Sequence, residues 1–145
     1  MKIKILIVNA HYYSNISKDL VSDAKLTLDR NKAKYETINV TGVFEIPVII
    51  AKNIKKYDGF IALGCVIKGE TPHFEFISKT TINAIMKLSV KSKKPIGNGI
   101  LTCMNISQAS ARSDPKREKR KGKEAAEAVL SVFGSCRAYR RWYYQ

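Results

Sequence analysis

The most informative stretch of the sequence runs from Gly64 to Glu75 and places a histidine directly after a helix-start signal. Thr71 is a preferred N-cap residue, and Pro72 suits the first helical position. The spacing therefore predicts a helix with His73 in its first turn. Free backbone amides at a helix start can hold an anion, and the helix dipole there favours a neutral imidazole. His73 beside a bound anion is a candidate proton acceptor and donor.

Each candidate residue also has a purely structural explanation. An isolated Thr-Pro-His could be only a capped helix with a surface histidine. Phe44 and Val66 could be core residues, and Arg112 begins a basic stretch that could simply be solvated. Cys65 has no base at a recognisable spacing, so we interpret it as a packing residue. We interpret His11 as a surface or loop histidine.

Apolar periodicity predicts the elements that must position these residues. Short apolar runs predict strands, at 2–8, 35–40, 59–66 and 95–102. Apolar residues that recur every three or four positions predict helices, at 16–28, 44–56, 74–88 and 125–133, with a short helix at 108–112. Strands that alternate with helices predict an α/β fold, a three-layer sandwich in which helices cover both faces of a parallel four-stranded sheet.

The predicted topology also indicates where a ligand would bind. In an open parallel sheet, ligands bind beyond the carboxyl ends of the strands. The loops after Val8, Val40, Val66 and Thr102 should therefore meet at one edge of the sheet. Most of the unusual residues lie in these loops, so we expect the site at this edge.

Length and composition favour one globular domain over residues 1–145, with 45% hydrophobic residues. No apolar run approaches the roughly 20 residues that span a bilayer. The apolar start is too short for a signal peptide, and Asn9, His11 and Tyr12 follow it without a small-residue cleavage pattern.

The cysteines and the charge limit the classes of function. Cys65, Cys103 and Cys136 are an odd set without metal-ligand spacing, which argues against a disulfide framework or a zinc site. A reducing cytoplasm is the simplest compartment. The formal net charge of +14 should attract anions, including phosphorylated metabolites and nucleic acid.

Four segments of the chain together resemble the lumazine synthase family. Gly64–Glu75 resembles the signature around that family's catalytic histidine, and Gly42–Pro47 resembles its Gly-Ala-Phe-Glu-Ile-Pro segment. The segments occur in the family's order with near-family spacing, and the resemblance runs from Lys2 to the closing helix. The other two segments are Gly99–Thr102 with Gln108, Ala109 and Arg112, and Lys121–Gly122 with Glu124–Ala126.

The resemblance implies a flavodoxin-like fold and a transferase activity. This enzyme would condense 5-amino-6-(D-ribitylamino)uracil with 3,4-dihydroxy-2-butanone 4-phosphate and release phosphate and water, in the penultimate step of riboflavin biosynthesis. The amine and ketone form an imine, phosphate is eliminated, and the ring closes with loss of water. No metal or organic cofactor is implied, because positioning and one acid–base group suffice for such proton transfers.

The resemblance also implies roles for individual residues. His73 would transfer protons, while the backbone of Glu70 and Thr71 would hold the butanone phosphate. Arg112 would pair with that phosphate through its forked guanidinium, and Lys121 would lie near it. The implied pyrimidine-binding residues are Tyr12, Val43, Phe44, Glu45, Cys65, Val66 and Ile67.

Some positions depart from the family's pattern. Asn98 stands where many members have an aromatic residue that reaches the pyrimidine from the neighbouring subunit, and its amide could contact the polar ring instead. Tyr13 replaces a common asparagine, Thr41 replaces a proline, and Val43 replaces a small residue.

The resemblance finally implies an assembly. Family members form pentamers, some of which pack into sixty-subunit shells, and the site lies between adjacent subunits. Asn98 and Arg112 would lie on one side of it and His73 on the other. We therefore expect a cytoplasmic homopentamer whose isolated monomer is inactive.

Three alternatives stay open. The tail at 135–145 interleaves arginines with aromatic residues, a composition that can bind single-stranded nucleic acid. A terminal extension packed on the oligomer is the simpler interpretation, and the chain lacks a recognisable nucleic-acid motif. A flavodoxin-like binding module without chemistry would not explain His73, Arg112 and Glu45 in one ordered set. A shell protein with a structural role could coexist with the enzyme activity.

Overall fold

The computed structural model describes residues 3–70, 73–117 and 120–134. The predicted tail at 135–145 therefore lies outside the described residues. The elements follow in this order: β1 (Lys4–Ala10), α1 (Ser14–Arg30), β2 (Lys34–Val40), the 3-10 helix η1 (Val43–Glu45), α2 (Ile46–Lys52), β3 (Gly59–Ile67), the 3-10 helix η2 (Lys68–Glu70), α3 (Phe74–Ser92), β4 (Ile96–Cys103), α4 (Ile106–Ser113) and α5 (Lys121–Val132).

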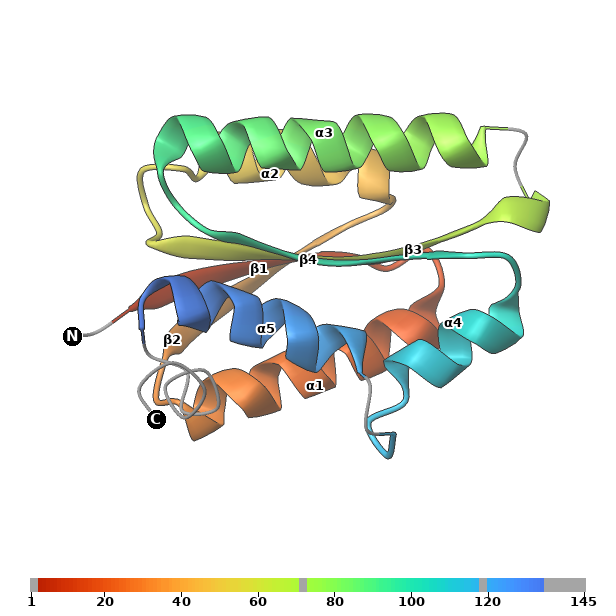
Figure 1. Cartoon of the computed structure of the whole chain (residues 1–145), viewed down its shortest axis with the longest axis horizontal. Helices are drawn as coiled ribbons and strands as arrows, with labels where there is room; N and C mark the ends of the chain where they lie inside the picture. Colours follow the sequence, from red (N-terminus) through yellow and green to blue (C-terminus); the bar gives the residue numbers. More distant parts are fainter. Residues whose placement is uncertain (1–2, 71–72, 118–119, 135–145) are drawn as a thin grey trace.

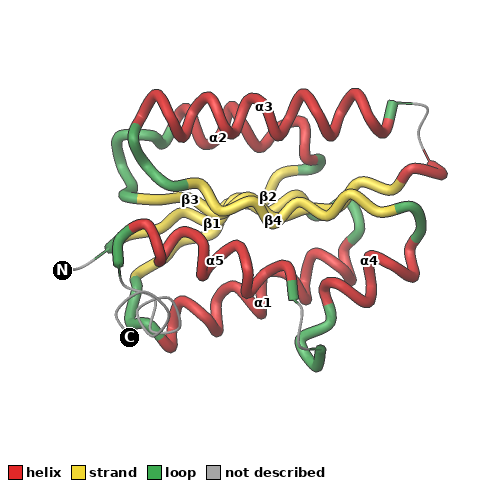
Figure 2. The backbone as a smooth tube through the Cα atoms, in the orientation of Figure 1, coloured by secondary structure: helices red, strands yellow, loops and turns green. Residues whose placement is uncertain are grey.

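The four described strands form one parallel sheet in the order β2-β1-β3-β4. Helices α2 and α3 cover one face of the sheet, and α1, α4 and α5 cover the other (Figure 1). The backbone tube shows the same three layers (Figure 2). The predicted three-layer α/β sandwich is confirmed. Because all strands run the same way, their carboxyl ends share one edge of the sheet, as expected.

Each face of the sheet has its own apolar core. Side chains alternate along a strand, so Ile5 and Ile7 of β1 face the α1 side while Leu6 and Val8 face the α2 side. β3 lies between β1 and β4 and is buried along its whole length. The four-residue apolar repeat predicted for α1 is confirmed, since its members are all buried: Ile16, Leu20, Ala24 and Leu28.

Helix α2 is shorter than the predicted helix at 44–56. Its residue Pro47 lies in the first turn, as the sequence indicated. The helix ends at Lys52 because Asn53 caps it, and the Asn53 side-chain amide donates to the Ile49 carbonyl at 2.8 Å. The chain then turns into β3.

Two glycines of β4 allow α5 to lie directly on the sheet. A Cβ atom at Gly97 would collide with the Ala125 carbonyl oxygen and lie 2.9 Å from Val129 Cγ2. A Cβ atom at Gly99 would lie 3.2 Å from Ala125 Cβ and collide with Leu63. At both positions the absence of a side chain lets α5 approach the sheet.

Gly97→Ala should therefore lower the free energy of unfolding by about 1–3 kcal/mol, because the neighbouring backbone must shift to accept the methyl group. Urea unfolding measures this change. Gly69→Ala is the matched control, since among the described residues no atom beyond its chain neighbours lies within 4 Å of its added Cβ. Equal losses for the two variants would contradict the close-packing argument.

Candidate functional site

A cavity of about 280 Å³ lies at the carboxyl edge of the sheet. The segments after β1 and β2, the 3-10 helix η1 and the carboxyl end of β3 contribute to it, and α3 contributes one side chain. The sheet thus gathers at one edge all seven residues expected to bind the pyrimidine. The lining residues are Tyr12, Tyr13, Thr41, Gly42, Val43, Phe44, Glu45, Cys65, Val66, Ile67 and Ile77.

Gly64 makes this arrangement possible. A Cβ atom there would lie 2.6 Å from Val43 Cγ1 and 3.1 Å from Ala10 Cβ. Its absence lets η1 pack against β3, so that Val43 is buried while Phe44 and Glu45 stay exposed at the cavity rim. The helix that follows fixes the direction of this segment.

The cavity combines an apolar floor with an aromatic and acidic rim. Val66 and Ile67 are buried, whereas Tyr12 and Phe44 are 68% and 62% exposed. Tyr12 meets Tyr13 edge to face, with ring centroids 4.9 Å apart. Exposed rings can stack on a flat heterocycle, and the Glu45 carboxylate can accept hydrogen bonds from ring N–H groups.

His73 lies at the entrance to α3 and is exposed. The described helix begins at Phe74, so His73 is its N-cap residue and the prediction that it lies in the first turn is wrong. The backbone angles of His73, φ −109° and ψ 17°, are not helical, and its carbonyl accepts the first helical hydrogen bond, from the Ile77 amide at 2.8 Å. Thr71 and Pro72 lie outside the described residues.

His73 does not line the cavity, but Ile77 does. His73 is nevertheless linked to the cavity wall through Ile77, whose backbone amide donates to the His73 carbonyl at 2.8 Å. The 3-10 helix η2, which ends at Glu70, connects the buried end of β3 to this region.

Arg112 and Lys121 lie away from the cavity, and Arg112 contacts Cys103. The Arg112 Nη1 atom donates to Cys103 Sγ at 3.9 Å. Burial raises the pKa of the Cys103 thiol, and the positive charges of Arg112 and Lys121 oppose that rise. Both cations, one on α4 and one at the start of α5, thus oppose the rise of this pKa at the carboxyl end of β4.

Asn98 is also outside the cavity. It lies on β4, the edge strand of the sheet, and is exposed. Its Oδ1 atom accepts a hydrogen bond from the Ile100 amide at 3.0 Å, which leaves the side-chain NH₂ group as a donor. Within one chain, the structure therefore does not join Asn98, Arg112 or Lys121 to the cavity.

Asp23 of α1 positions the start of α5. Its Oδ2 atom accepts the Lys123 amide hydrogen at 3.2 Å and pairs with Arg120 Nε at 3.4 Å. Helix α5 has no side-chain cap of its own, so this carboxylate satisfies an amide at the positive end of the helix. Gly122 assists, because a Cβ there would collide with the Leu20 carbonyl oxygen.

Sequence reasoning did not assign a role to four residues that line the cavity. Tyr13, Thr41 and Gly42 are sequence neighbours of residues expected to bind the pyrimidine. Their position in the same loops could have indicated that they line the cavity. Ile77 could have been found from helical spacing, because it lies one turn after His73.

The described residues give no sign of a metal centre or a membrane span. They contain no cluster of three histidine, cysteine or acidic side chains that could hold a metal ion. No helix in that part of the chain combines the length and the apolar character that crossing a bilayer requires.

Comparisons with known proteins identify a single family. The sequence profile described as 6,7-dimethyl-8-ribityllumazine synthase matches residues 2–137. The chain is 47% identical over 135 residues to the protein of that name from Bartonella henselae, covering 90% of this chain and 86% of the relative. It is 43% identical over 135 residues to the Agrobacterium fabrum protein of that name, covering 88% of this chain and 90% of the relative.

Asp23 should make stability depend on pH. Burial raises the pKa of its carboxyl above the ordinary 3.8, although Arg120 opposes the rise. Between the unfolded and folded pKa values, the folded state binds more protons, so the free energy of unfolding falls as pH rises through this window. The wild-type protein should therefore gain stability relative to Asp23→Asn as pH falls from about 7 to about 4.

Urea unfolding at several pH values measures this difference. The exposed acid of α3 provides the control variant, Glu75→Gln. A stability difference between wild type and Asp23→Asn that stays constant or shrinks on acidification would contradict the assignment.

Proposed function

The chain belongs to the 6,7-dimethyl-8-ribityllumazine synthase family, and we propose that the cavity at its sheet edge is the pyrimidine pocket of this enzyme. The enzyme is a transferase of riboflavin biosynthesis. It condenses 5-amino-6-(D-ribitylamino)uracil with 3,4-dihydroxy-2-butanone 4-phosphate and releases phosphate and water. The observation that carries the proposal is the convergence of three separate segments on one cavity: Tyr12, Val43–Glu45 and Cys65–Ile67.

The pyrimidine binds with its ring against the exposed aromatic side chains of Tyr12 and Phe44. The Glu45 carboxylate accepts from N–H groups of the substrate, and the buried side chains of Val66 and Ile67 form the floor. A flat, donor-rich heterocycle matches this combination better than an aliphatic ligand, which would leave the carboxylate without a partner.

The phosphate of the second substrate binds near the start of α3. We assign the backbone of Glu70 and Thr71 to hold it. The space beside Gly69 supports close approach, since an added Cβ there meets no atom of the described residues within 4 Å beyond its chain neighbours. Arg112 pairs with the phosphate through its guanidinium. Lys121, which acts electrostatically at the same thiol as Arg112, adds a second positive charge.

His73 transfers protons between the two bound substrates. It accepts a proton as the pyrimidine amine attacks the ketone, and it returns a proton to the oxygen that leaves as water when the imine forms. Elimination of phosphate and closure of the ring need the same kind of transfer. A group that both accepts and donates near neutral pH suits this sequence.

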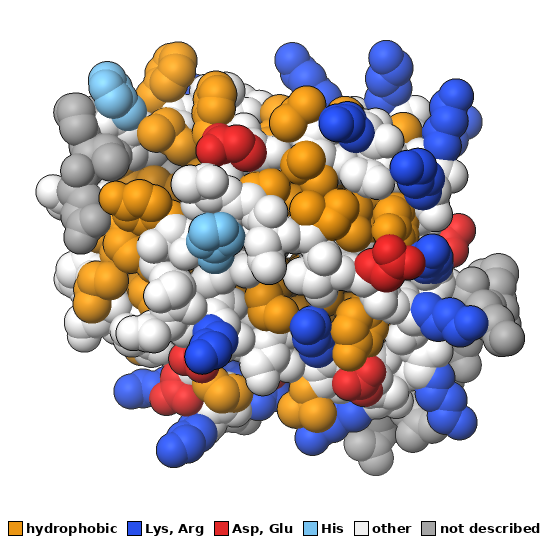
Figure 3. Space-filling model, turned by 180° about the vertical axis from the view of Figure 1, so that it is seen from behind, with side chains coloured by type: hydrophobic (Ala, Val, Ile, Leu, Met, Phe, Trp, Pro, Cys, Tyr) orange, Lys and Arg blue, Asp and Glu red, His pale blue; other side chains and the backbone are white. Residues whose placement is uncertain are grey.

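The site is shared between subunits. Arg112, Lys121 and Asn98 lie away from the cavity of their own chain, and a neighbouring copy supplies them. Exposed apolar side chains on α2 and α3 support such an assembly, since Val48, Phe76, Met86 and Val90 are all more than half exposed. Figure 3 shows apolar side chains in the middle and upper left of one face, with lysines and arginines along its margins.

We assign a homopentamer in the cytoplasm as the working form of the enzyme. A sixty-subunit shell is the alternative assembly, and mass measurement in solution distinguishes the two. The partners of the site are the two small substrates, and neither a membrane nor nucleic acid belongs to the proposal.

His73→Ala should lower turnover by about ten- to ten-thousand-fold, because the reaction loses its proton-transfer group. The assay mixes the two substrates with purified oligomer and follows lumazine fluorescence above the spontaneous background. His11→Ala is the matched histidine control and should keep its activity. An undiminished rate in His73→Ala would remove this residue from the mechanism, and no rate in the wild type would favour a binding module.

A mixing experiment tests the shared site. Arg112→Ala should chiefly weaken binding of the butanone phosphate, and an oligomer of this variant should be nearly inactive at low substrate. Subunits of Arg112→Ala and His73→Ala, unfolded and refolded together in equal amounts, should recover about a quarter of wild-type activity, because about one interface in four then combines two intact halves. Activity no higher than that of the separate variants would mean that each site lies within one chain.

A further inference from the structure

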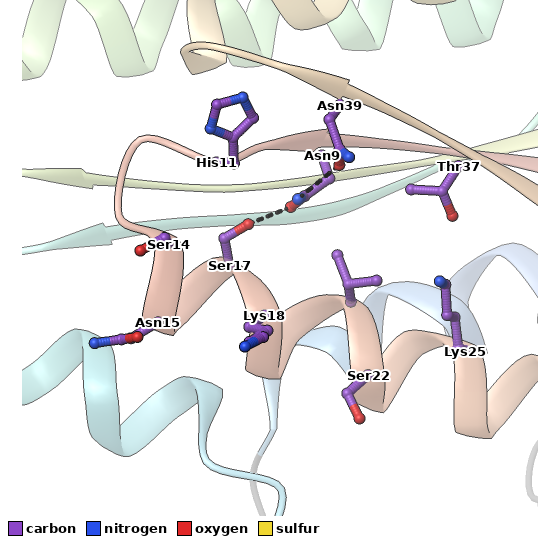
Figure 4. Close-up of a pocket in the computed structure, with 11 residues that line it drawn as sticks. Asn9, His11, Ser14, Asn15, Ser17, Lys18, Ser22, Lys25, Thr37 and Asn39 are labelled. Carbon is purple, nitrogen blue, oxygen red and sulfur yellow. Dashed lines mark hydrogen bonds between the residues drawn. The ribbon is translucent and has the colours of Figure 1, made fainter.

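A second and larger cavity, of about 700 Å³, lies between α1 and the edge strand β2. Its volume falls within the range of small-molecule sites. None of its lining residues belongs to the proposed pyrimidine pocket. The lining residues are Asn9, His11, Ser14, Asn15, Ser17, Lys18, Val21, Ser22, Lys25, Thr37 and Asn39, and Figure 4 draws them.

The cavity exists because the apolar core stops short of this edge. On the α1 face of β2, Tyr35 packs against the core, but the next residues with the same orientation, Thr37 and Asn39, are polar. The facing side of α1 presents mainly serines and lysines, with Val21 as its apolar member. The sheet face is therefore open here, whereas it is covered over β1 and β3.

A chain of hydrogen bonds forms the inner wall of this cavity. The Ser17 hydroxyl donates to Asn9 Oδ1 at 2.9 Å, and Asn9 Nδ2 donates to Asn39 Oδ1 at 3.2 Å. Figure 4 shows this chain crossing from α1 through β1 to β2. Asn9 and Ser17 are 5% and 4% exposed, so both are fixed in place. The bond to Asn9 leaves the Asn39 NH₂ group to donate to a ligand.

The lining is positively charged. Among the described residues it contains the cations Lys18 and Lys25 and no aspartate or glutamate, and His11 adds an imidazole ring. In Figure 4 the Lys25 side chain points from α1 toward the hydroxyl of Thr37 on the strand. The two lysines are seven residues apart on one helix, or about 10 Å along its axis. Hydroxyl groups of serine and threonine and amide groups of asparagine also line the cavity.

We propose that this cavity is a second ligand site, which binds a small phosphate ester with several hydroxyl groups. A lysine ammonium holds the phosphate as a point charge. The Asn39 amide and the hydroxyls of Thr37 and Ser22 hydrogen-bond the ligand's hydroxyls. An uncharged polyol would leave the ammonium groups without a partner, and an aromatic ligand would leave the hydroxyls and amides unpaired.

The test is isothermal titration of the intact oligomer with ribose 5-phosphate. The Arg112→Ala background is used, because it removes the guanidinium that pairs with phosphate at the proposed catalytic site and so weakens phosphate binding there. We expect one ribose 5-phosphate per chain. Lys25→Gln should weaken this binding about tenfold, which is the loss of one charge-assisted hydrogen bond. Lys18→Gln should weaken it as well.

Lys79→Gln is the matched control, since Lys79 is an exposed lysine on α3, on the other face of the sheet. It should leave the affinity unchanged. With Arg112 intact, Lys25→Gln should keep the full rate of lumazine formation, which separates this site from the catalytic one. Circular dichroism of each variant checks that the fold is retained.

Several results would overturn the proposal. Absence of ribose 5-phosphate binding would do so, as would equal losses of affinity in Lys25→Gln and Lys79→Gln. Equally tight binding of uncharged ribitol would show that the lysines do not recognise a phosphate. Equally tight binding of inorganic phosphate would show that the hydroxyl and amide groups recognise nothing.

Discussion

The whole structure depends on the burial of β3 between β1 and β4. Every residue of this strand is buried, so both helical layers must pack on it and both apolar cores meet there. Because both faces of the strand are buried, its carboxyl end leaves the core at one defined position. Its last residues, Cys65–Ile67, form the cavity wall, and the chain then leads through η2 to His73. Because Gly64 has no side chain, η1 can pack against this end of the strand.

Close backbone packing positions α5, which carries Lys121 of the proposed shared site. Gly97 and Gly99 bring α5 onto the sheet, and Gly122 brings its first turn onto α1. The buried carboxylate of Asp23 then fixes the beginning of that helix, where Lys121 lies. The cavity is lined by the loops after β1 and β2, by η1, by the end of β3 and by one residue of α3, whereas Arg112 lies on α4 and Lys121 on α5. The two cations do not reach the cavity within one chain, and this separation supports our proposal that a second chain completes the site.

Periodicity was sufficient to predict the layers, because buried strands and amphipathic helices leave strong patterns. It was weaker at the ends of elements, where a few local bonds decide. Helix α2 ends early at the Asn53 cap, and α3 begins at Phe74 because His73 is not helical. The residues expected to bind the pyrimidine converge on one edge of the sheet, and this convergence followed from the parallel topology. The position of Arg112 beside Cys103 could not be predicted, since it depends on how α4 packs.

The second cavity could not be predicted from the sequence, for a different reason. Its residues come from β1, α1 and β2, and asparagine, serine and threonine at such positions are common in any chain. Only the fold shows that Ser17, Asn9 and Asn39 form one bonded chain. On our two proposals, the excess of lysine and arginine acts at two distinct places. A phosphate group alone would not distinguish these two places. The neighbouring groups must distinguish them, and they are hydroxyls and amides beside Lys25 but a buried thiol beside Arg112.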